Sequence, residues 1–119
     1  MIKLIRNMSK EELADLHIGN NIEGRTKIQE YNKKTKYVVC FFPISEEYQA
    51  NTWFYDVCVV FEAKEEIFEK TSGVYPNWNS PSWEDTNVLT EYHIIKYNKY
   101  IVKPLYYYWT KESNKKYYF

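Results

Sequence analysis

The most regular feature of the chain is a series of short apolar runs separated by polar segments. Two of these runs are nearly continuous in apolar character and rich in β-branched and aromatic residues. That pattern is typical of strands that are covered on both faces of a sheet. We therefore predict two central strands, one over Thr35–Ile44 and one over Trp53–Phe61.

Shorter apolar runs predict three further strands, at Ile2–Ile5, Val88–Ile95 and Tyr100–Trp109. The last two are close in sequence, with a turn expected near Asn98. We therefore expect them to form the closing pair of strands.

One helix has clear boundary signals. Ser9 and Glu12 have the spacing of a capping box, in which the Ser9 hydroxyl accepts a hydrogen bond from the Glu12 amide. Leu13 and Leu16 lie three residues apart on one face, and Gly19 is a natural end. This predicts a helix of about three turns at most.

Two shorter helices are predicted on weaker evidence. The first begins at Ser45, has acidic residues in its first turn and carries Tyr48. The second is amphipathic and covers Ala63–Lys70, with Ile67 and Phe68 on its buried side.

The polar segments predict irregular structure. Asn20–Thr35 is interpreted as a loop or a ragged sheet edge, and Thr71–Thr86 as the longest irregular segment. We expect the tail, Lys111–Phe119, to fray.

The order of these elements lacks regular alternation of strands and helices, which argues against a doubly wound parallel sheet. We predict an α+β fold, a compact mixed or split β-sheet with short flanking helices. At 119 residues the chain is expected to form a single domain, 1–119, with its core in residues 1–110.

Composition narrows the class of protein further. Aromatic residues make up 19% of the chain, which favours strands because aromatic side chains suit half-buried pleated surfaces. Sixteen basic residues balance sixteen acidic ones, and this balance disfavours duplex DNA as a direct ligand. Cys40 and Cys58 lie in apolar runs, so we expect buried free thiols.

With no signal peptide and no apolar run near the ~20 residues of a membrane span, we expect a cytoplasmic protein that does not contact a membrane.

The sequence lacks the common motifs that identify a phosphate-binding, catalytic or zinc site on their own. The three glycines are too far apart for a phosphate-binding loop, and no nucleophile elbow is present. His17 and His93 each stand without the helical spacing of a zinc site, so no metal is expected. The paired acids Glu46–Glu47 and Glu65–Glu66 are explained by the dipoles of the predicted helices.

Several blocks, taken in order, carry a resemblance to a known family. They are Lys3-Leu4-Ile5-Arg6 with Ser9-Lys10-Glu11-Glu12-Leu13, Cys40-Phe41-Phe42, Asp56-Val57-Cys58-Val59-Val60-Phe61-Glu62, Ser72-Gly73-Val74-Tyr75 and Glu91-Tyr92. From Ile2 to about Tyr108 the chain resembles a small ADP-ribosyltransferase-type domain. It is also similar to small proteins of bacteriophages and prophages of low-GC bacteria.

The resemblance implies an NAD site. Glu91 would be the catalytic carboxylate, holding the ribose 2′-hydroxyl and stabilising the positive charge of an oxocarbenium-like transition state. Arg6 would bind NAD through its ribose or phosphates. Phe41, Phe42 and Tyr48 are candidates for stacking on nicotinamide. This chemistry requires Arg6 and Glu91 to face one crevice.

The chain also departs from the family. Leu89 stands where a second glutamate would precede the catalytic one, and a Ser-Thr-Ser triplet is absent. Two functions therefore stay open. One is NAD-dependent ADP-ribosylation of a host component by a protein encoded on a phage or mobile element. The other is an inactive relative that inhibits a host defence system, by binding a host protein or nucleoprotein complex or by capturing a nucleotide signal. In the contact reading, Trp78, Trp83, Tyr107 and Trp109 would be the partner-binding aromatics.

Overall fold

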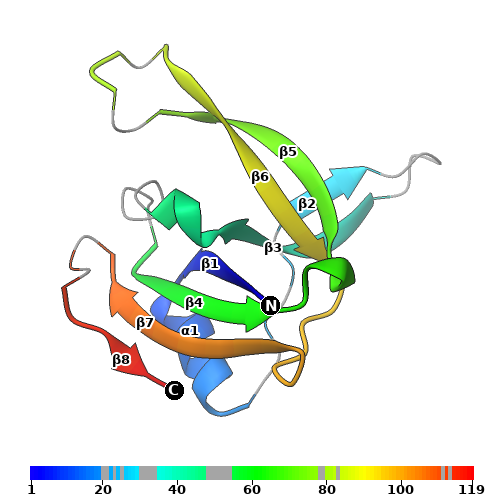
Figure 1. Ribbon diagram of the computed structural model, residues 1–119, viewed down its shortest axis with the longest axis vertical. Coiled ribbons are helices and arrows are strands. Elements are labelled where there is room, and N and C mark those ends of the chain that lie inside the picture. The colour runs from blue at the N-terminus through cyan, green and yellow to red at the C-terminus, as the bar shows by residue number, and fades with distance from the viewer. Residues whose placement is uncertain are drawn as a thin grey trace.

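In the residues that it describes, a computed structural model of the chain shows one α-helix and an antiparallel sheet, an α+β fold (Figure 1). It describes residues 1–19, 22, 24, 26–29, 35–47, 55–77, 80–82, 84–110, 112 and 114–119. Seven strands follow the order β5-β6-β3-β1-β4-β7-β8, and β2 pairs with β3 outside this path. All of these pairings are antiparallel, so the mixed sheet expected from the sequence is wrong.

The elements of the described chain have the following bounds. They are β1 (Ile2–Met8), α1 (Lys10–His17), β2 (Thr26–Gln29), β3 (Thr35–Pro43), the 3₁₀ turn η1 (Ile44–Glu46), β4 (Val57–Ala63), the 3₁₀ turn η2 (Glu65–Ile67), β5 (Glu69–Pro76), β6 (Thr86–Ile94), β7 (Val102–Trp109) and β8 (Tyr117–Tyr118).

The middle of the sheet is formed by the most apolar strands. β1 lies between β3 and β4, and every residue of β4 except Glu62 is buried. The prediction that the apolar runs of β3 and β4 are central and covered on both faces is confirmed, because Val38–Phe42 and Val57–Phe61 are buried as well. Both cysteines are buried free thiols, as expected.

Alternation along the strands divides the core into two clusters on opposite faces. The helix face carries Leu4, Met8, Val39, Phe41, Val59 and Phe61 and is covered by Leu13 and Leu16 of α1. The cysteine face carries Ile5, Cys40, Phe42, Cys58, Val60 and Leu89. Neighbouring residues of one strand, such as Phe41 and Phe42, therefore serve different faces of the sheet.

The helix forms as its capping box predicts. The Ser9 hydroxyl accepts a hydrogen bond from the Glu12 amide at 3.1 Å, and the chain leaves the helix at Ile18 and Gly19. Gly19 has a φ of +86°, a left-handed conformation that glycine adopts without strain. Within the described part of the chain, no helix has the length and apolar character that crossing a bilayer requires.

Two sequence predictions between residues 63 and 86 are wrong. The helix expected over 63–70 is replaced by the three-residue η2 and the start of β5. Much of the segment expected to be irregular, 71–86, is strand, because residues 69–76 pair in full with 86–93. Of the short helix expected from Ser45, the described residues hold η1 and Glu47, while Tyr48 lies outside the described residues.

The described part of the tail is held to the sheet by aromatic contacts. β8 pairs with β7, and the Tyr117 and Tyr107 rings stack at a centroid distance of 5.2 Å. The ring centroid of Phe119 lies 4.9 Å from that of His17 and 5.5 Å from that of Tyr107. This part of the tail therefore carries aromatic contacts of its own to the sheet and to α1.

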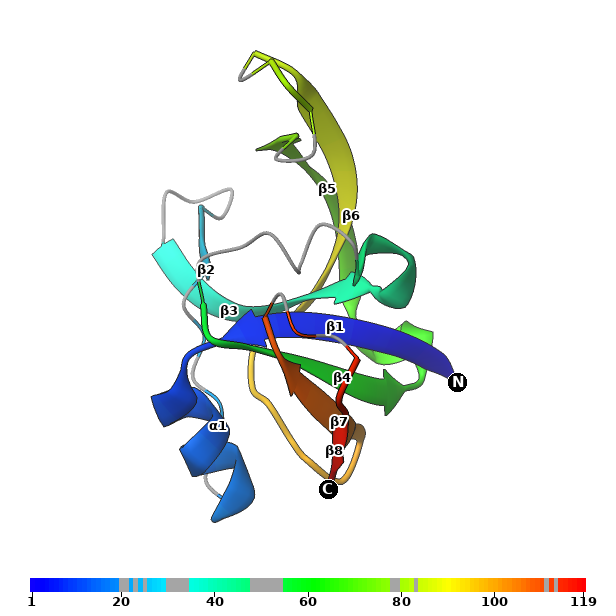
Figure 2. The same ribbon diagram turned by 90° about the vertical axis from the view of Figure 1, so that its left-hand side faces the viewer.

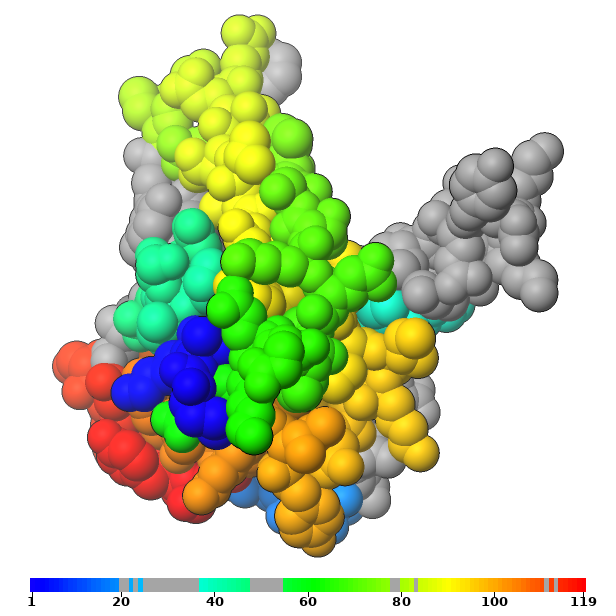
Figure 3. All heavy atoms as spheres, turned by 45° about the vertical axis from the view of Figure 1, so that its right-hand side comes forward, coloured from blue at the N-terminus to red at the C-terminus, as the bar shows by residue number. Residues whose placement is uncertain are grey.

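A long hairpin stands away from the rest of the sheet. β5 and β6 pair over their whole length, but only Tyr92, His93 and Ile94 of β6 also pair with β3. Figures 1 and 2 show the hairpin rising from the body of the protein, and it forms a distinct protrusion in Figure 3. We call the part beyond this pairing, residues 71–76 and 86–91, the arm.

Candidate functional site

Arg6 is a buried structural residue on the helix face. Only 2% of it is exposed, and its guanidinium donates two hydrogen bonds to the Glu12 carboxylate, at 2.9 and 3.2 Å. A third hydrogen bond runs to the Cys40 carbonyl at 2.9 Å, and the Phe41 ring centroid lies 5.9 Å from the guanidinium carbon. This fork of donors is therefore engaged within the protein.

Glu91 lies on the cysteine face. Its carboxylate oxygen Oε1 accepts a hydrogen bond from the Tyr75 hydroxyl at 2.7 Å and from the Cys40 thiol at 3.4 Å. His93 Nε2 lies 3.5 Å from the same oxygen. Burial, together with the neighbouring Glu91 carboxylate, raises the pKa of Tyr75, which keeps the hydroxyl protonated as a donor.

The two residues that the family resemblance would place in one crevice thus point to opposite faces. Arg6 shares the helix face with Leu4 and Met8, while Glu91 contacts Cys40 of the cysteine face. The two aromatic candidates are divided in the same way. Phe41 packs beside Arg6, and Phe42 packs edge-to-face with Tyr75 at 5.6 Å. The geometry does not bring these four residues to a common NAD site.

The remaining predicted binding residues have separate surroundings. Tyr107 is partly buried and packs on the helix-face cluster, and its ring contacts His17 at 5.5 Å. Trp109 is 37% exposed at the end of β7. Tyr48, Trp78 and Trp83 lie outside the described residues.

The group that the fold does assemble is Cys40, Glu91 and His93. All three are buried, and one ligand atom from each lies within 4.8 Å of the others. Cys40 and His93 are directly paired across β3 and β6, and Glu91 precedes His93 by two residues on the same face. Glu91 is also the first residue of β6 beyond its pairing with β3, so the cluster lies at the root of the arm.

Gly73 makes room for this carboxylate. A methyl group at Gly73 would lie 2.5 Å from Glu91 Oε2 and 2.8 Å from the Tyr75 ring. The residue has no left-handed backbone conformation, so the need for glycine is one of space. A side chain there would displace the Glu91 carboxylate.

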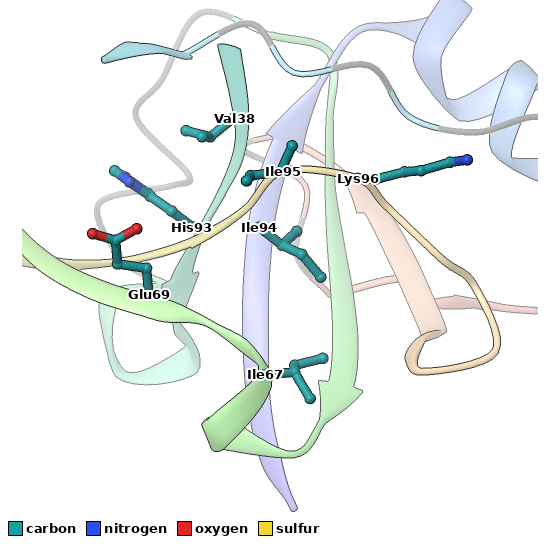
Figure 4. A pocket seen from close by; sticks show the side chains of 7 residues that line it. All are labelled: Val38, Ile67, Glu69, His93, Ile94, Ile95 and Lys96. Atoms are coloured by element: carbon teal, nitrogen blue, oxygen red, sulfur yellow. The ribbon is translucent and has the colours of Figure 1, made fainter. Parts of the chain in front are cut away.

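A shallow hollow lies beside the cluster. His93 lines it together with Val38, Ile67, Glu69 and residues 94–96. In Figure 4 the side chains of Glu69 and His93 point to the left, whereas those of Ile67 and Ile94 point to the right. Because Glu69 is exposed and is the cross-strand partner of His93, the hollow connects His93 with the surface beside an acidic side chain.

Sequence reasoning found Glu91 but missed its partners. The search for metal ligands considered helical spacings, whereas Glu91-x-His93 is a strand spacing that places both side chains on one face. Cys40 was expected only to be a small buried hydrophobe. Its position opposite His93 depends on the register of β3 against β6, which no local signal in the sequence provides.

Comparison with models of protein families, with curated proteins and with solved structures finds no match to this chain.

Proposed function

We propose that the chain is a binding protein that recognises a partner protein through its arm. Of the two functions that the sequence leaves open, direct contact is the one that the geometry favours. The guanidinium of Arg6 is engaged by Glu12 and by a backbone carbonyl, and Glu91 contacts residues of the other face. Transfer chemistry that needs both residues around one NAD molecule has no support from this arrangement.

The observation that carries the proposal is an exposed apolar pair on the arm. Val74 and Val88 are directly opposite each other across β5 and β6, and they are 69% and 71% exposed. Valines at such positions gain nothing from the core of the protein, whereas they would gain from burial against a partner. Cross-strand pairs of this kind form one continuous apolar contact.

The edge of the arm supplies a second argument. Among the described strands β5 pairs only with β6, so its other edge has backbone amides and carbonyls available for a further strand. Proteins protect such edges with charges and proline. In β5 these residues are at the ends, Glu69, Lys70 and Pro76, and the centre from Thr71 to Tyr75 is uncharged.

We therefore assign an extended, uncharged segment of a partner protein as the occupant of this edge. It would add to β5 as a further antiparallel or parallel strand, and apolar side chains at alternate positions would pack on Val74, with Val88 continuing the apolar surface one strand further on. Main-chain hydrogen bonds would supply affinity, and the valine pair would supply selectivity for apolar residues.

The test is selection of ligands from a displayed library of random peptides on the wild-type protein. We expect the selected peptides to have β-forming, alternating apolar sequences. Val74→Glu should weaken their binding at least about tenfold, since a charge at the centre of the contact costs more than about 1.4 kcal/mol. The shifts of backbone amide signals on binding should concentrate in β5.

Ile18→Glu is the matched control, because Ile18 is also an exposed apolar residue, at 74%, but lies at the end of α1. It should bind the peptides as the wild type does. Equal binding by Val74→Glu and the wild type would overturn the proposal. So would saturable NAD binding with turnover that disappears in Glu91→Gln, because that result would restore the enzymatic reading.

A further inference from the structure

The buried cluster at the root of the arm has the side chains of a metal centre. Cys40 provides a thiol, His93 an imidazole and Glu91 a carboxylate, and these three types of ligand together are typical of zinc sites. The cluster is separate from the exposed edge of the arm.

The separations of the ligand atoms fit a tetrahedral ion. With bonds to zinc of about 2.3 Å for sulfur and about 2.0–2.2 Å for nitrogen and oxygen, tetrahedral geometry requires roughly 3.6 Å between S and O and roughly 3.4 Å between N and O. The observed distances to Glu91 Oε1 are 3.4 Å from Cys40 Sγ and 3.5 Å from His93 Nε2. The third separation, between the Cys40 sulfur and the His93 ring nitrogen, lies within 4.8 Å. It is the one that binding of an ion would have to shorten.

His93 provides an independent observation that points to a ligand. Only 6% of the residue is exposed, and its Nε2 atom is buried without a hydrogen-bond partner. Buried polar atoms in native proteins nearly always have a partner, because leaving one unpaired costs about 1–3 kcal/mol in lost solvation. This nitrogen faces the Glu91 carboxylate from the position that a metal ligand would take.

The surroundings meet the other requirements of a metal site. The Tyr75 hydroxyl holds Glu91 Oε1 at 2.7 Å, and Gly73 leaves space for the second carboxylate oxygen. Such outer contacts orient the ligands of natural metal centres. The hollow lined by His93 lies next to the cluster, and the exposed Glu69 is among the residues that line it (Figure 4).

We propose that Cys40, Glu91 and His93 bind one divalent transition-metal ion of the zinc class. The thiol proton is released to solvent on binding, so Cys40 coordinates as a thiolate. Three protein ligands leave the fourth position for water or another donor. Because Cys40 belongs to β3 and the other two ligands belong to β6, the ion would fix the arm to the sheet.

The experiment is titration of the apo protein with Co²⁺, a spectroscopic substitute for Zn²⁺. We expect one ion per chain, a sulfur-to-cobalt charge-transfer band and the strong visible absorption of tetrahedral Co²⁺, all displaced by Zn²⁺. Cys40→Ser should lose the charge-transfer band, and His93→Gln and Glu91→Gln should each bind at least about tenfold more weakly.

Cys58→Ser is the matched control, because Cys58 is the other buried cysteine of the cysteine face. It should keep the charge-transfer band and the stoichiometry of the wild type. Near-ultraviolet circular dichroism of each variant checks that the fold is retained.

Wild-type protein that shows no charge-transfer band with Co²⁺ would overturn the proposal, whether or not any variant folds. A band that survives Cys40→Ser and disappears in Cys58→Ser would also overturn it. Binding of equal strength in the wild type and in His93→Gln would place the ion elsewhere, as adventitious surface binding, and would have the same consequence.

Discussion

Removing one partner of the ion pair between Arg6 and Glu12 is expected to destabilise the fold strongly. Arg6→Ala removes three hydrogen bonds of 2.9 to 3.2 Å and takes the buried guanidinium away from the Glu12 carboxylate, which is 15% exposed. Breaking a buried pair in this way typically costs about 3–5 kcal/mol. That is a large share of the ~5–15 kcal/mol by which a domain is normally stable.

Urea denaturation followed by tryptophan fluorescence measures this loss. For a protein of this size the expected cost corresponds to a fall of about 2 M in the urea midpoint. The double variant Arg6→Met with Glu12→Leu should regain most of the stability, because a buried ion pair can be replaced by apolar side chains at little net cost.

The pair between Lys70 and Glu65 is the matched control. It has the same 2.9 Å separation, but its side chains are 55% and 49% exposed. Lys70→Ala should leave the urea midpoint unchanged within error, because exposed pairs are screened by solvent. If Arg6→Ala unfolds at the wild-type midpoint and instead loses affinity for NAD, the structural role of Arg6 is refuted.

Three other features give separate predictions. Gly73→Ala should lower the free energy of unfolding by about 1–2 kcal/mol in urea denaturation, because the added methyl group overlaps the Glu91 carboxylate; an unchanged midpoint would contradict this. Ser9→Ala should cost about 1 kcal/mol in the same assay through loss of the helix cap, whereas Ser9→Thr should cost little. Burial raises the pKa of Tyr97 and Tyr108 above the ordinary value near 10, so the folded protein keeps protons that the unfolded chain releases. The free energy of unfolding should therefore be independent of these two tyrosines below about pH 10 and fall above it, by up to about 1.4 kcal/mol per pH unit for each tyrosine. Denaturation of Tyr97→Phe across this range should show a shallower fall. An equally steep fall would contradict the assignment.

The strands of the core could be predicted because their signals are local. The runs Val38–Phe42 and Val57–Phe61 consist of β-forming, apolar residues, so each run predicts a buried strand without information from the rest of the chain. The capping box at Ser9 predicted the start of α1 for the same reason, since it needs only four consecutive residues.

Strand β5 of the arm was missed because it has neither a continuous apolar run nor a regular alternation of apolar and polar residues. Its residues from Glu69 to Ser72 are exposed and polar, so they show no alternation of apolar and polar positions. Ile67 and Phe68 gave the preceding segment the pattern of a short amphipathic helix. The register of β5 against β6, a tertiary contact, decides the strand instead.

The candidate site required information that a single sequence does not hold. Whether Arg6 and Glu91 share a face depends on the register of β1 against β3 and of β3 against β6. A shift of one residue in either pairing would exchange the faces. The spacing of Glu91 and His93 could have been recognised as a strand motif, but the position of Cys40 opposite His93 could not.

The central claim is that Arg6 and Glu91 belong to opposite faces of the sheet. Nuclear Overhauser contacts between assigned side-chain protons test it most directly. We predict contacts of the Arg6 side chain with the Phe41 ring, and contacts of the Glu91 side chain with Gly73 and the Tyr75 ring. A contact between the side chains of Arg6 and Glu91 would contradict the account.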